Sequence, residues 1–283
     1  YQPGTNRLRK SWIGGTANEP VNDNFAHDAH GAMVVMEDLP GLSWDFADRL
    51  KSIDPGTGPE AWYVYDGGGE RVRKIRHRTG SDTRTERFYF GGFEIYREYG
   101  ADGAVTRERE TLHVSDDTGR IALVETLTLE AGAPVAPDPV VRYQMGNHLG
   151  SVSLELDETG GEISREEYHP YGTSAYYSGA GGARYPPKRY RYTGKERDEE
   201  TGFTYHGARY YAPWLARWTA ADPIGIGDGL NVYAYVGGRP VGSVDPGGMA
   251  EKPKDWDERQ RQQALNPLDP FGPGGRLWAL GIV

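Results

Sequence analysis

The feature that most constrains the fold is a loosely repeated unit in which two strand-like runs flank a turn of Asp and Gly residues. The clearest copy is 63–75 (YVYDGGGERVRKI), and weaker copies occupy 25–31, 42–50 and 114–123. Asp-Gly and Gly-Gly pairs supply the positive φ that a tight hairpin turn needs. Because a lone hairpin is barely stable in water, neighbouring units must pair into a continuing sheet. The repeat therefore predicts an all-β fold.

The composition agrees with many short strands separated by turns. The 283 residues include 40 Gly, 19 Pro and 19 Tyr, which is too much Gly and Pro for a helical protein. A formal net charge of −9 argues against a nucleic-acid partner. The absence of Cys excludes a disulfide scaffold and thiolate metal sites, and no apolar run reaches the roughly 18 residues of a membrane span.

A basic cluster interrupts the acidic background. It comprises Arg71, Arg73, Lys74, Arg76 and Arg78. Such a cluster could bind phosphate, but charged residues also protect the solvated edge of a strand. We favour the solvated edge.

Changes in composition divide the chain. Residues 126–139 and 173–187 are rich in Pro, Ala or Gly and predict loops. Residues 188–249 are dense in aromatic, Arg and turn residues, which predicts a compact cap or plug. From Ala250 the chain becomes polar and helix-favouring, so the boundary at 248–250 is the sharpest. Because the chain opens at Tyr1 within repeat-like sequence, we expect an internal piece of a longer protein.

Two segments of the chain resemble a known family. Residues 143–172 (YQMGNHLGSVSLELDETGGEISREEYHPYG) resemble the segment before the core of Rhs and YD-repeat proteins, and 188–249 resembles the Rhs repeat-associated core domain. The C components of insecticidal toxin complexes are the most similar variety, followed by Rhs effectors of contact-dependent secretion systems. The resemblance implies a spiral β-sheet strip that forms part of a hollow shell, closed by an inward-turning core plug. It divides the chain into a shell segment (1–142), a pre-core segment with the core (143–249) and the start of a released segment (250–283).

Two positions depart from the family pattern. Gly237-Gly238-Arg239-Pro240 stands where many relatives have Asn-Asn-Pro, and the last core motif is Asp245-Pro-Gly-Gly-Met249 rather than a form ending Asp-Gly-Leu. Met in the last place resembles the toxin-complex variety. We therefore still expect the cut after Met249.

The resemblance also implies self-cleavage just after the core, at the Met249–Ala250 bond. The positions that match the family's functional residues are Asp222, Asp245 and Arg209. Two Asp side chains held close together cannot both ionise, so one can take a proton from water while the other polarises the scissile carbonyl. A guanidinium beside them favours one ionised carboxylate. The expected activity is that of an intramolecular aspartyl protease that acts once, in cis, without a cofactor or a metal.

The local sequence suggests how Asp245 could reach this bond. In an extended chain the residue would lie roughly 13 Å away. Pro246-Gly247 favours a type II turn, with positive φ at Gly247. Such a turn would fold the carboxylate back toward its own chain.

Other polar residues that could belong to a functional site have a simpler structural interpretation. His206 could be a general base, but a packed or turn histidine is more common. His27 and His30 with Asp28 could suggest a metal site, although no further ligand has suitable spacing. The acidic run 198–200 could imitate a glycosidase pair, but most such runs are solvated turns.

These observations favour a toxin-encapsulating shell whose core releases a C-terminal toxin segment into the cavity. We expect its own C-terminal segment to be the cargo. We also expect the shell to be completed either by a second shell-forming protein, similar to the B component of toxin complexes, or by the upstream shell of the same chain. It would be made in the bacterial cytoplasm and then secreted or delivered to a target cell. One alternative is a non-catalytic surface or adhesion protein that binds carbohydrate or another cell. A second is an enzyme that acts in trans on external substrates.

Overall fold

The hairpin turns of this protein share one backbone pattern. The computed structural model describes residues 1–11, 23–36, 39–78, 80–117, 119–179, 185–250 and 252–253. In the turn after Tyr65, the Asp66 carboxylate accepts hydrogen bonds from the N–H groups of Gly68 and Glu70, and Gly69 has a φ of 88°. The Asp157 turn repeats these contacts, with φ 81° at Gly160. Asp therefore caps the turn and Gly provides the left-handed residue, which explains the sequence repeat.

Over the described residues, these hairpins join into one antiparallel sheet of thirteen strands, most of which follow in chain order from β5 to β17. Register shifts at the hairpin ends, as between Val64 and Tyr65, mark β-bulges that increase the twist of the sheet. The strands are β5 Gly41–Trp44, β6 Leu50–Asp54, β7 Pro59–Tyr65, β8 Arg71–Arg78, β9 Arg84–Tyr89, β10 Phe93–Tyr99, β11 Val105–Asp116, β12 Gly119–Glu130, β13 Ala133–Pro134, β14 Val140–Gly146, β15 Val152–Leu156, β16 Glu162–Tyr168 and β17 Ser174–Gly179.

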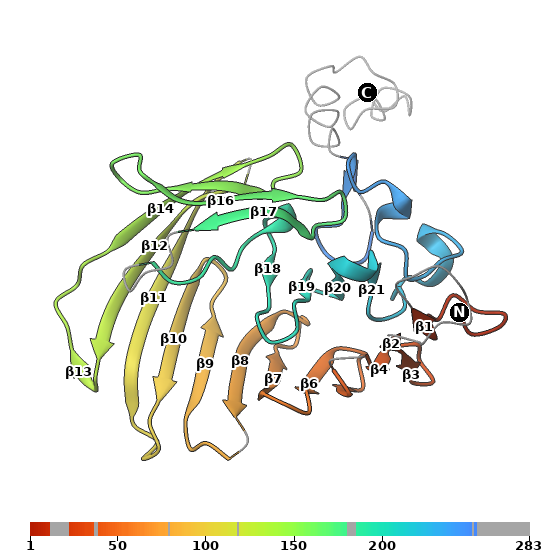
Figure 1. Ribbon diagram of the computed structural model, residues 1–283, viewed down its shortest axis with the longest axis horizontal. Coiled ribbons are helices and arrows are strands. Elements are labelled where there is room, and N and C mark those ends of the chain that lie inside the picture. Colours follow the sequence, from red (N-terminus) through yellow and green to blue (C-terminus); the bar gives the residue numbers. More distant parts are fainter. Residues whose placement is uncertain are drawn as a thin grey trace, which may run out of the picture.

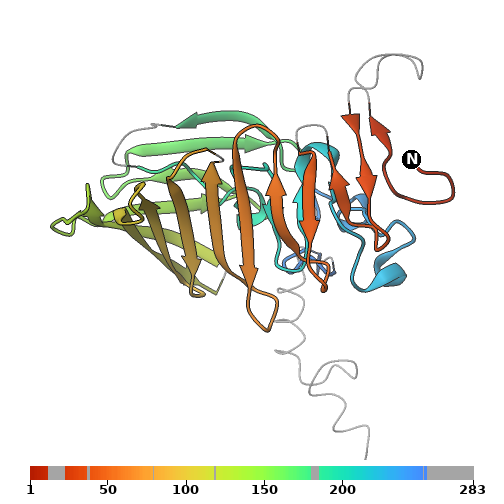
Figure 2. The same ribbon diagram turned by 90° about the horizontal axis from the view of Figure 1, so that it is seen from below.

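The sheet is strongly curved, and the chain after β17 turns back inside the curve (Figure 1). There it forms a four-stranded sheet with short 3-10 helices rather than a continuation of the large sheet. Figure 2 shows the large sheet from below, with this inner segment behind it. The inner elements are η1 Tyr192–Gly194, β18 Glu196–Arg197, β19 Thr204–Tyr205, β20 Tyr210–Ala212, η2 Pro213–Leu215, β21 Arg217–Trp218, η3 Gly225–Asp228, η4 Val236–Gly238 and β22 Ser243–Val244.

Short pairs of strands complete the described fold. Near the N-terminus, β1 Lys10–Ser11 pairs with β2 Asp23–Asn24, and β3 Ala26–His27 pairs with β4 Met33–Val35. At the other end of the chain, β22 pairs with β23 Lys252–Pro253. Within the described ranges, none of the helices is long and apolar enough to cross a membrane.

Two apolar clusters attach the inner segment to the sheet. The first joins the early strands to the inner sheet, and the second is an aromatic cluster that includes the hairpin residue Leu149. The buried members of the first are Phe25, Met33, Met36, Leu39, Leu42, Leu50, Ile53, Ala61, Tyr63, Phe203, Tyr210 and Ala212. Those of the second are Leu149, Tyr192, Tyr211, Trp218, Tyr235 and Val236. The expected all-β strip with an inward-turning plug is confirmed.

Both predicted loops are partly wrong. β12 continues to Glu130, because it forms a twelve-residue hairpin partner for β11, and β13 follows within the same predicted loop. In the predicted loop 173–187, residues 174–179 form β17, which pairs along β16. This strand carries the half-exposed side chains of Tyr176 and Tyr177. Residues 180–184 lie outside the described part of the chain. The division at 142/143 falls inside β14, so the sheet continues across it, and the three-domain division stays a prediction.

Two glycines with similar backbone allow the packing of the hairpins onto the inner segment to be tested. Gly172 has a φ of 92°, and a Cβ there would lie 2.6 Å from the Tyr192 ring. Gly160 has a φ of 81° and open space around it. We expect Gly160→Ala to cost about 1–2 kcal/mol through its backbone alone. Gly172→Ala should cost more, because Tyr192 must also move.

Urea unfolding of both variants, followed by tryptophan fluorescence, measures this difference. Equal unfolding midpoints would contradict the observed contact between the 169–173 hairpin and the inner segment.

Candidate active site

Arg209 lies at the centre of the candidate site. It directly precedes β20, and its side chain is only 2% exposed. Its Nη2 atom lies 2.9 Å from Asp222 Oδ2 and 3.5 Å from Asp245 Oδ2. Its Nε atom donates to the backbone oxygen of Gly248 at 2.5 Å, and the guanidinium lies 4.2 Å from the Trp218 ring. One cation thus contacts both predicted carboxylates and the chain next to the predicted cut.

Asp245 follows β22 and is bound on both carboxylate oxygens. Oδ2 faces Arg209, while Oδ1 accepts from the N–H groups of Gly247, Gly248 and Met249 at 3.3, 2.8 and 3.2 Å. Burial raises the pKa of the Asp245 carboxyl, although Arg209 and these N–H groups act in the opposite direction. This is the environment of a carboxyl group that holds a proton more readily than an exposed Asp.

Asp222 reaches the same guanidinium from a different turn. Its side chain is 5% exposed, and Oδ1 accepts from the N–H of Ile224 at 3.0 Å while Oδ2 pairs with Arg209. Its own N–H donates to the oxygen of Val232, which fixes the start of the turn. The structure therefore brings Asp222, Asp245 and Arg209 together, although they lie far apart in sequence.

The turn at Asp245 differs from the predicted type II turn. Gly248, rather than Gly247, has the positive φ, at 72°. The Asp245 carboxylate organises the turn by accepting three successive N–H groups, so positive φ at Gly247 is unnecessary. The carboxylate is nevertheless folded back onto its own chain.

This turn places Asp245 close to the predicted cleavage site. Met249 N lies 3.2 Å from Asp245 Oδ1, and the carbonyl carbon of Met249 is only two covalent bonds further, about 2.5 Å from that nitrogen. The Met249 side chain is half-exposed and Ala250 is exposed. A cavity of about 730 Å³ borders the turn and is lined in part by Lys195, His206 and Gly247.

His206 is fully buried, which confirms the prediction of a packed histidine. Its Nδ1 atom lies 2.7 Å from the backbone oxygen of Asp245, and its ring meets Trp218 edge-on. Burial lowers the pKa of His206 to about 3, and the charge of Lys195 adds to this effect. The ring is therefore neutral at ordinary pH and holds the turn as a hydrogen-bonding group.

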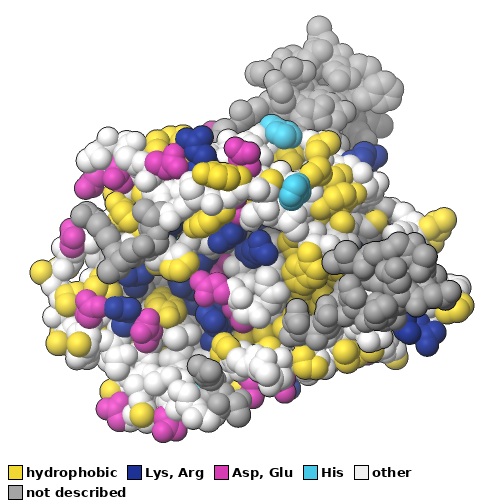
Figure 3. Space-filling model, in the orientation of Figure 1, with side chains coloured by type: hydrophobic (Ala, Val, Ile, Leu, Met, Phe, Trp, Pro, Cys, Tyr) yellow, Lys and Arg dark blue, Asp and Glu magenta, His cyan; other side chains and the backbone are white. Residues whose placement is uncertain are grey.

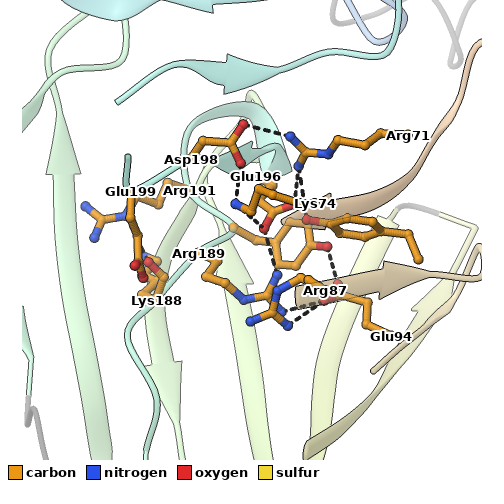
Figure 4. Close-up of polar contacts among 12 residues, drawn as sticks. Arg71, Lys74, Arg87, Glu94, Lys188, Arg189, Arg191, Glu196, Asp198 and Glu199 are labelled. Carbon is orange, nitrogen blue, oxygen red and sulfur yellow. Dashed lines mark hydrogen bonds and ion pairs between the residues drawn. The ribbon is translucent and has the colours of Figure 1, made fainter. Parts of the chain in front are cut away.

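The basic cluster on β8 contradicts the predicted solvated edge. β8 lies inside the sheet, between β7 and β9. Arg71 is buried and pairs with Glu196 at 2.6 Å and with Asp198 at 2.7 Å. Lys74 is also buried and lies 2.7 Å from Asp198. Figure 4 shows these side chains meeting between the large sheet and the inner segment.

The acidic run is likewise not a solvated turn. Asp198 is fully buried, the Glu200 side chain is 1% exposed, and only Glu199 is half-exposed. These acidic side chains balance the positive charge of β8, because Arg76 pairs with Glu199 and Lys74 lies 3.5 Å from Glu200. The space-filling view shows charged side chains gathered in the hollow inside the curve of the sheet (Figure 3).

The histidines near the N-terminus have separate partners. His27 packs edge-on against Tyr233, and His30 Nδ1 lies 2.7 Å from Asp48. The Asp28 carboxylate caps the turn at Gly31. Across the described ranges, no group of three or more His, Asp or Glu side chains is arranged to hold a metal.

Comparisons with known proteins agree with this fold. No family model matches the chain. The toxin subunit YenC1 of Yersinia entomophaga is 39% identical over 223 residues, which are 75% of this chain and 22% of that protein. The toxin subunit YenC2 of the same organism is 34% identical over 260 residues, which are 88% and 26% of the respective chains. The crystal structure of TcdB2-TccC3 matches with a TM-score of 0.68 and 34% identity, over 79% of this chain and 11% of that one.

The chain therefore belongs to the Rhs/YD-repeat family of toxin components. Within that family it is homologous to the subunits of toxin complexes named above. It spans about a quarter of the length of the two Yersinia relatives.

The buried His206 should make the fold sensitive to mild acid. Its pKa is about 3 in the folded protein and 6.5 in the unfolded chain, so the unfolded state binds more protons between these values. The stability it provides is complete above pH 6.5 and is lost progressively as the pH falls toward 3. We expect His206→Phe to lose less stability than the wild type between pH 7 and pH 5.

Melting temperatures at both pH values test this expectation, with the exposed His148→Gln as the control. An identical decrease in the wild type and His206→Phe would show that His206 is not held neutral.

Proposed function

We propose that this chain is part of a toxin-encapsulating shell, and that its core domain cuts the chain once between Met249 and Ala250. The observation that carries the proposal is the contact of one guanidinium with both carboxylates and with Gly248 O, directly before the residue to be cut. The buried site places these groups in surroundings where their electrostatic interactions are strong.

The two carboxylates take different roles in this proposal. Asp222 pairs with Arg209 as a carboxylate and takes a proton from the attacking water. Asp245, whose pKa is raised by burial, carries a proton on Oδ2, which lies 3.5 Å from Arg209, and donates a hydrogen bond from it to the Met249 carbonyl oxygen. The water oxygen bonds to the Met249 carbonyl carbon. The carbon–nitrogen bond to Ala250 then breaks as that nitrogen gains the proton that Asp222 took from the water. The products are a Met249 carboxylic acid and an Ala250 amine.

The substrate of this reaction is the chain itself. Asp245 lies four residues before the bond, and its carboxylate already binds the Met249 amide. Holding the reacting groups in one molecule removes most of the entropic cost of bringing them together. The activity is therefore that of an intramolecular aspartyl protease with a single turnover, and it uses no cofactor.

The curved sheet supports the role of the chain in a container. Across the described residues the large sheet does not close on itself. Charged side chains gather in its hollow (Figure 3), and the inner segment lies inside the curve (Figure 1). We propose that the strip continues in the upstream shell of the same chain or meets a second shell-forming protein. The crystal structure of TcdB2-TccC3 is in keeping with such a partner.

The released segment would begin at Ala250, and most of 250–283 lies outside the described residues. In this proposal the segment is the start of the cargo, which stays in the cavity until delivery. The protein is made in the bacterial cytoplasm and is then secreted or delivered to a target cell.

The protease proposal predicts a cut chain whose cleavage depends on both carboxylates. In intact-mass spectrometry after denaturation, the wild type should appear as two pieces divided after Met249. Asp222→Asn and Asp245→Asn remove one acid each without changing the shape of the side chain, so both should be uncut or at least about a hundredfold slower. The control is Asp157→Asn, which changes an equivalent turn-capping Asp between β15 and β16 and should be cut normally.

Denaturation is necessary because a cut segment can remain bound. An uncut wild type would exclude the protease and leave the shell, or the alternative adhesion module. Cleavage in both Asn variants would remove these two carboxylates from the mechanism.

A further inference from the structure

The turn before the cut is held through its backbone, one carbonyl group at a time. Four consecutive oxygens, from residue 245 to residue 248, each accept a hydrogen bond from the segment 195–209. The donors are His206 Nδ1 to Asp245 O at 2.7 Å, Lys195 Nζ to Pro246 O at 2.5 Å, Ala208 N to Gly247 O at 3.0 Å and Arg209 Nε to Gly248 O at 2.5 Å. We call this set of four contacts the carbonyl clamp.

The N–H groups of the same turn are bound as well. Those of Gly247, Gly248 and Met249 all donate to Asp245 Oδ1, and Pro246 has no N–H. Both sides of the backbone are therefore fixed. Moving the chain by one residue through the clamp would break every one of these contacts. The loss would be costly above all at the buried residues Asp245 and Gly248, where water cannot replace the lost partners.

Two glycines allow the two backbones to approach closely. A Cβ on Gly248 would lie 2.9 Å from Arg209 N and 3.2 Å from His206 O. On the opposite side, a Cβ on Gly207 would lie 3.2 Å from Gly247 O. The clamp thus recognises a chain of a particular backbone shape, with glycine at position 248.

Met249 is the first residue beyond the clamp. Its amide is bound by Asp245, but its side chain is 49% exposed. Side-chain recognition normally requires a buried pocket with complementary groups, which a half-exposed side chain does not have. The bond to be cut is therefore distinguished by its distance from the clamp.

We infer that the carbonyl clamp selects the cleaved bond by position, so that the cut follows the first residue after Gly248, whatever that residue is. This inference rests on the proposed self-cleavage. Lys195 and His206 are positioning residues in it: they hold the carbonyls of Pro246 and Asp245 and so set which carbonyl faces the two acids.

An insertion in the full chain separates position from side-chain identity. With one Ala inserted between Gly248 and Met249, the cut should fall after the new Ala, and the released fragment should begin with Met-Ala. In parallel, Met249→Ala without an insertion should be cut at the unchanged position, at a rate within about tenfold of the wild type. The mass of the released fragment distinguishes the outcomes.

A cut after Met in the insertion variant would overturn the inference while leaving the protease intact. Loss of cleavage in Met249→Ala would overturn it too, because the side chain would then be required. A failure of the proposed function itself looks different, because the wild type would then be uncut.

Removal of one hydrogen-bond donor of the carbonyl clamp should allow cleavage at more than one peptide bond. Lys195→Met loses the hydrogen bond to Pro246 O, and cleavage should become about ten- to hundredfold slower. The released fragments should also begin at more than one residue, and Lys195→Arg should restore part of the rate and the single terminus. The control is Lys51→Met, at an exposed position on β6.

A uniform terminus at wild-type rate in Lys195→Met would show that this donor does not position the bond. The ragged terminus is the decisive readout, because a general loss of stability slows cleavage without moving it.

Discussion

The interaction on which the site depends is the burial of one guanidinium between separate turns of the inner segment. Arg209 joins the Asp222 turn, the Asp245 turn and the Trp218 ring. A buried cation requires such partners, and removing one member of a buried pair typically costs about 3–5 kcal/mol. Arg209 therefore stabilises the fold of the core and, in our account, holds the two acids where the chain returns past them.

The same principle applies along the concave face of the sheet. The chain from Lys188 to Glu200 crosses strands whose inward side chains are charged, and it meets them with opposite charges. Arg189 pairs with Glu94 at 2.8 Å (Figure 4). Lys188 pairs with Glu166 at 3.1 Å, and all four side chains are at least nine-tenths buried. These directional pairs fix where the segment lies, and the apolar and aromatic clusters anchor its neighbouring parts.

Much of this arrangement follows from the sequence because it depends on local rules. Asp-x-x-Gly turns predict hairpins, since Asp66 and Gly69 fulfil their roles within one turn. The burial of Arg71 and Asp198 could not be predicted, because it results from pairing across 127 residues of sequence. Charged residues on a strand look solvated until their partners are known. Lys195 was missed for the same reason, since its contact with Pro246 O depends entirely on the tertiary fold.

In the proposed mechanism, water directed by the two acids cuts the Met249–Ala250 bond. Cell-free synthesis of the chain in oxygen-18 water, followed by mass spectrometry of the fragment that ends at Met249, tests this step. The proposed mechanism predicts that this fragment carries one oxygen-18 atom in its new terminal carboxylate. The other fragment should begin at Ala250 and carry the label only at its own C-terminus, because water hydrolyses the last ester bond when translation ends. An uncut chain, or a Met249 fragment without the heavy oxygen, would contradict it.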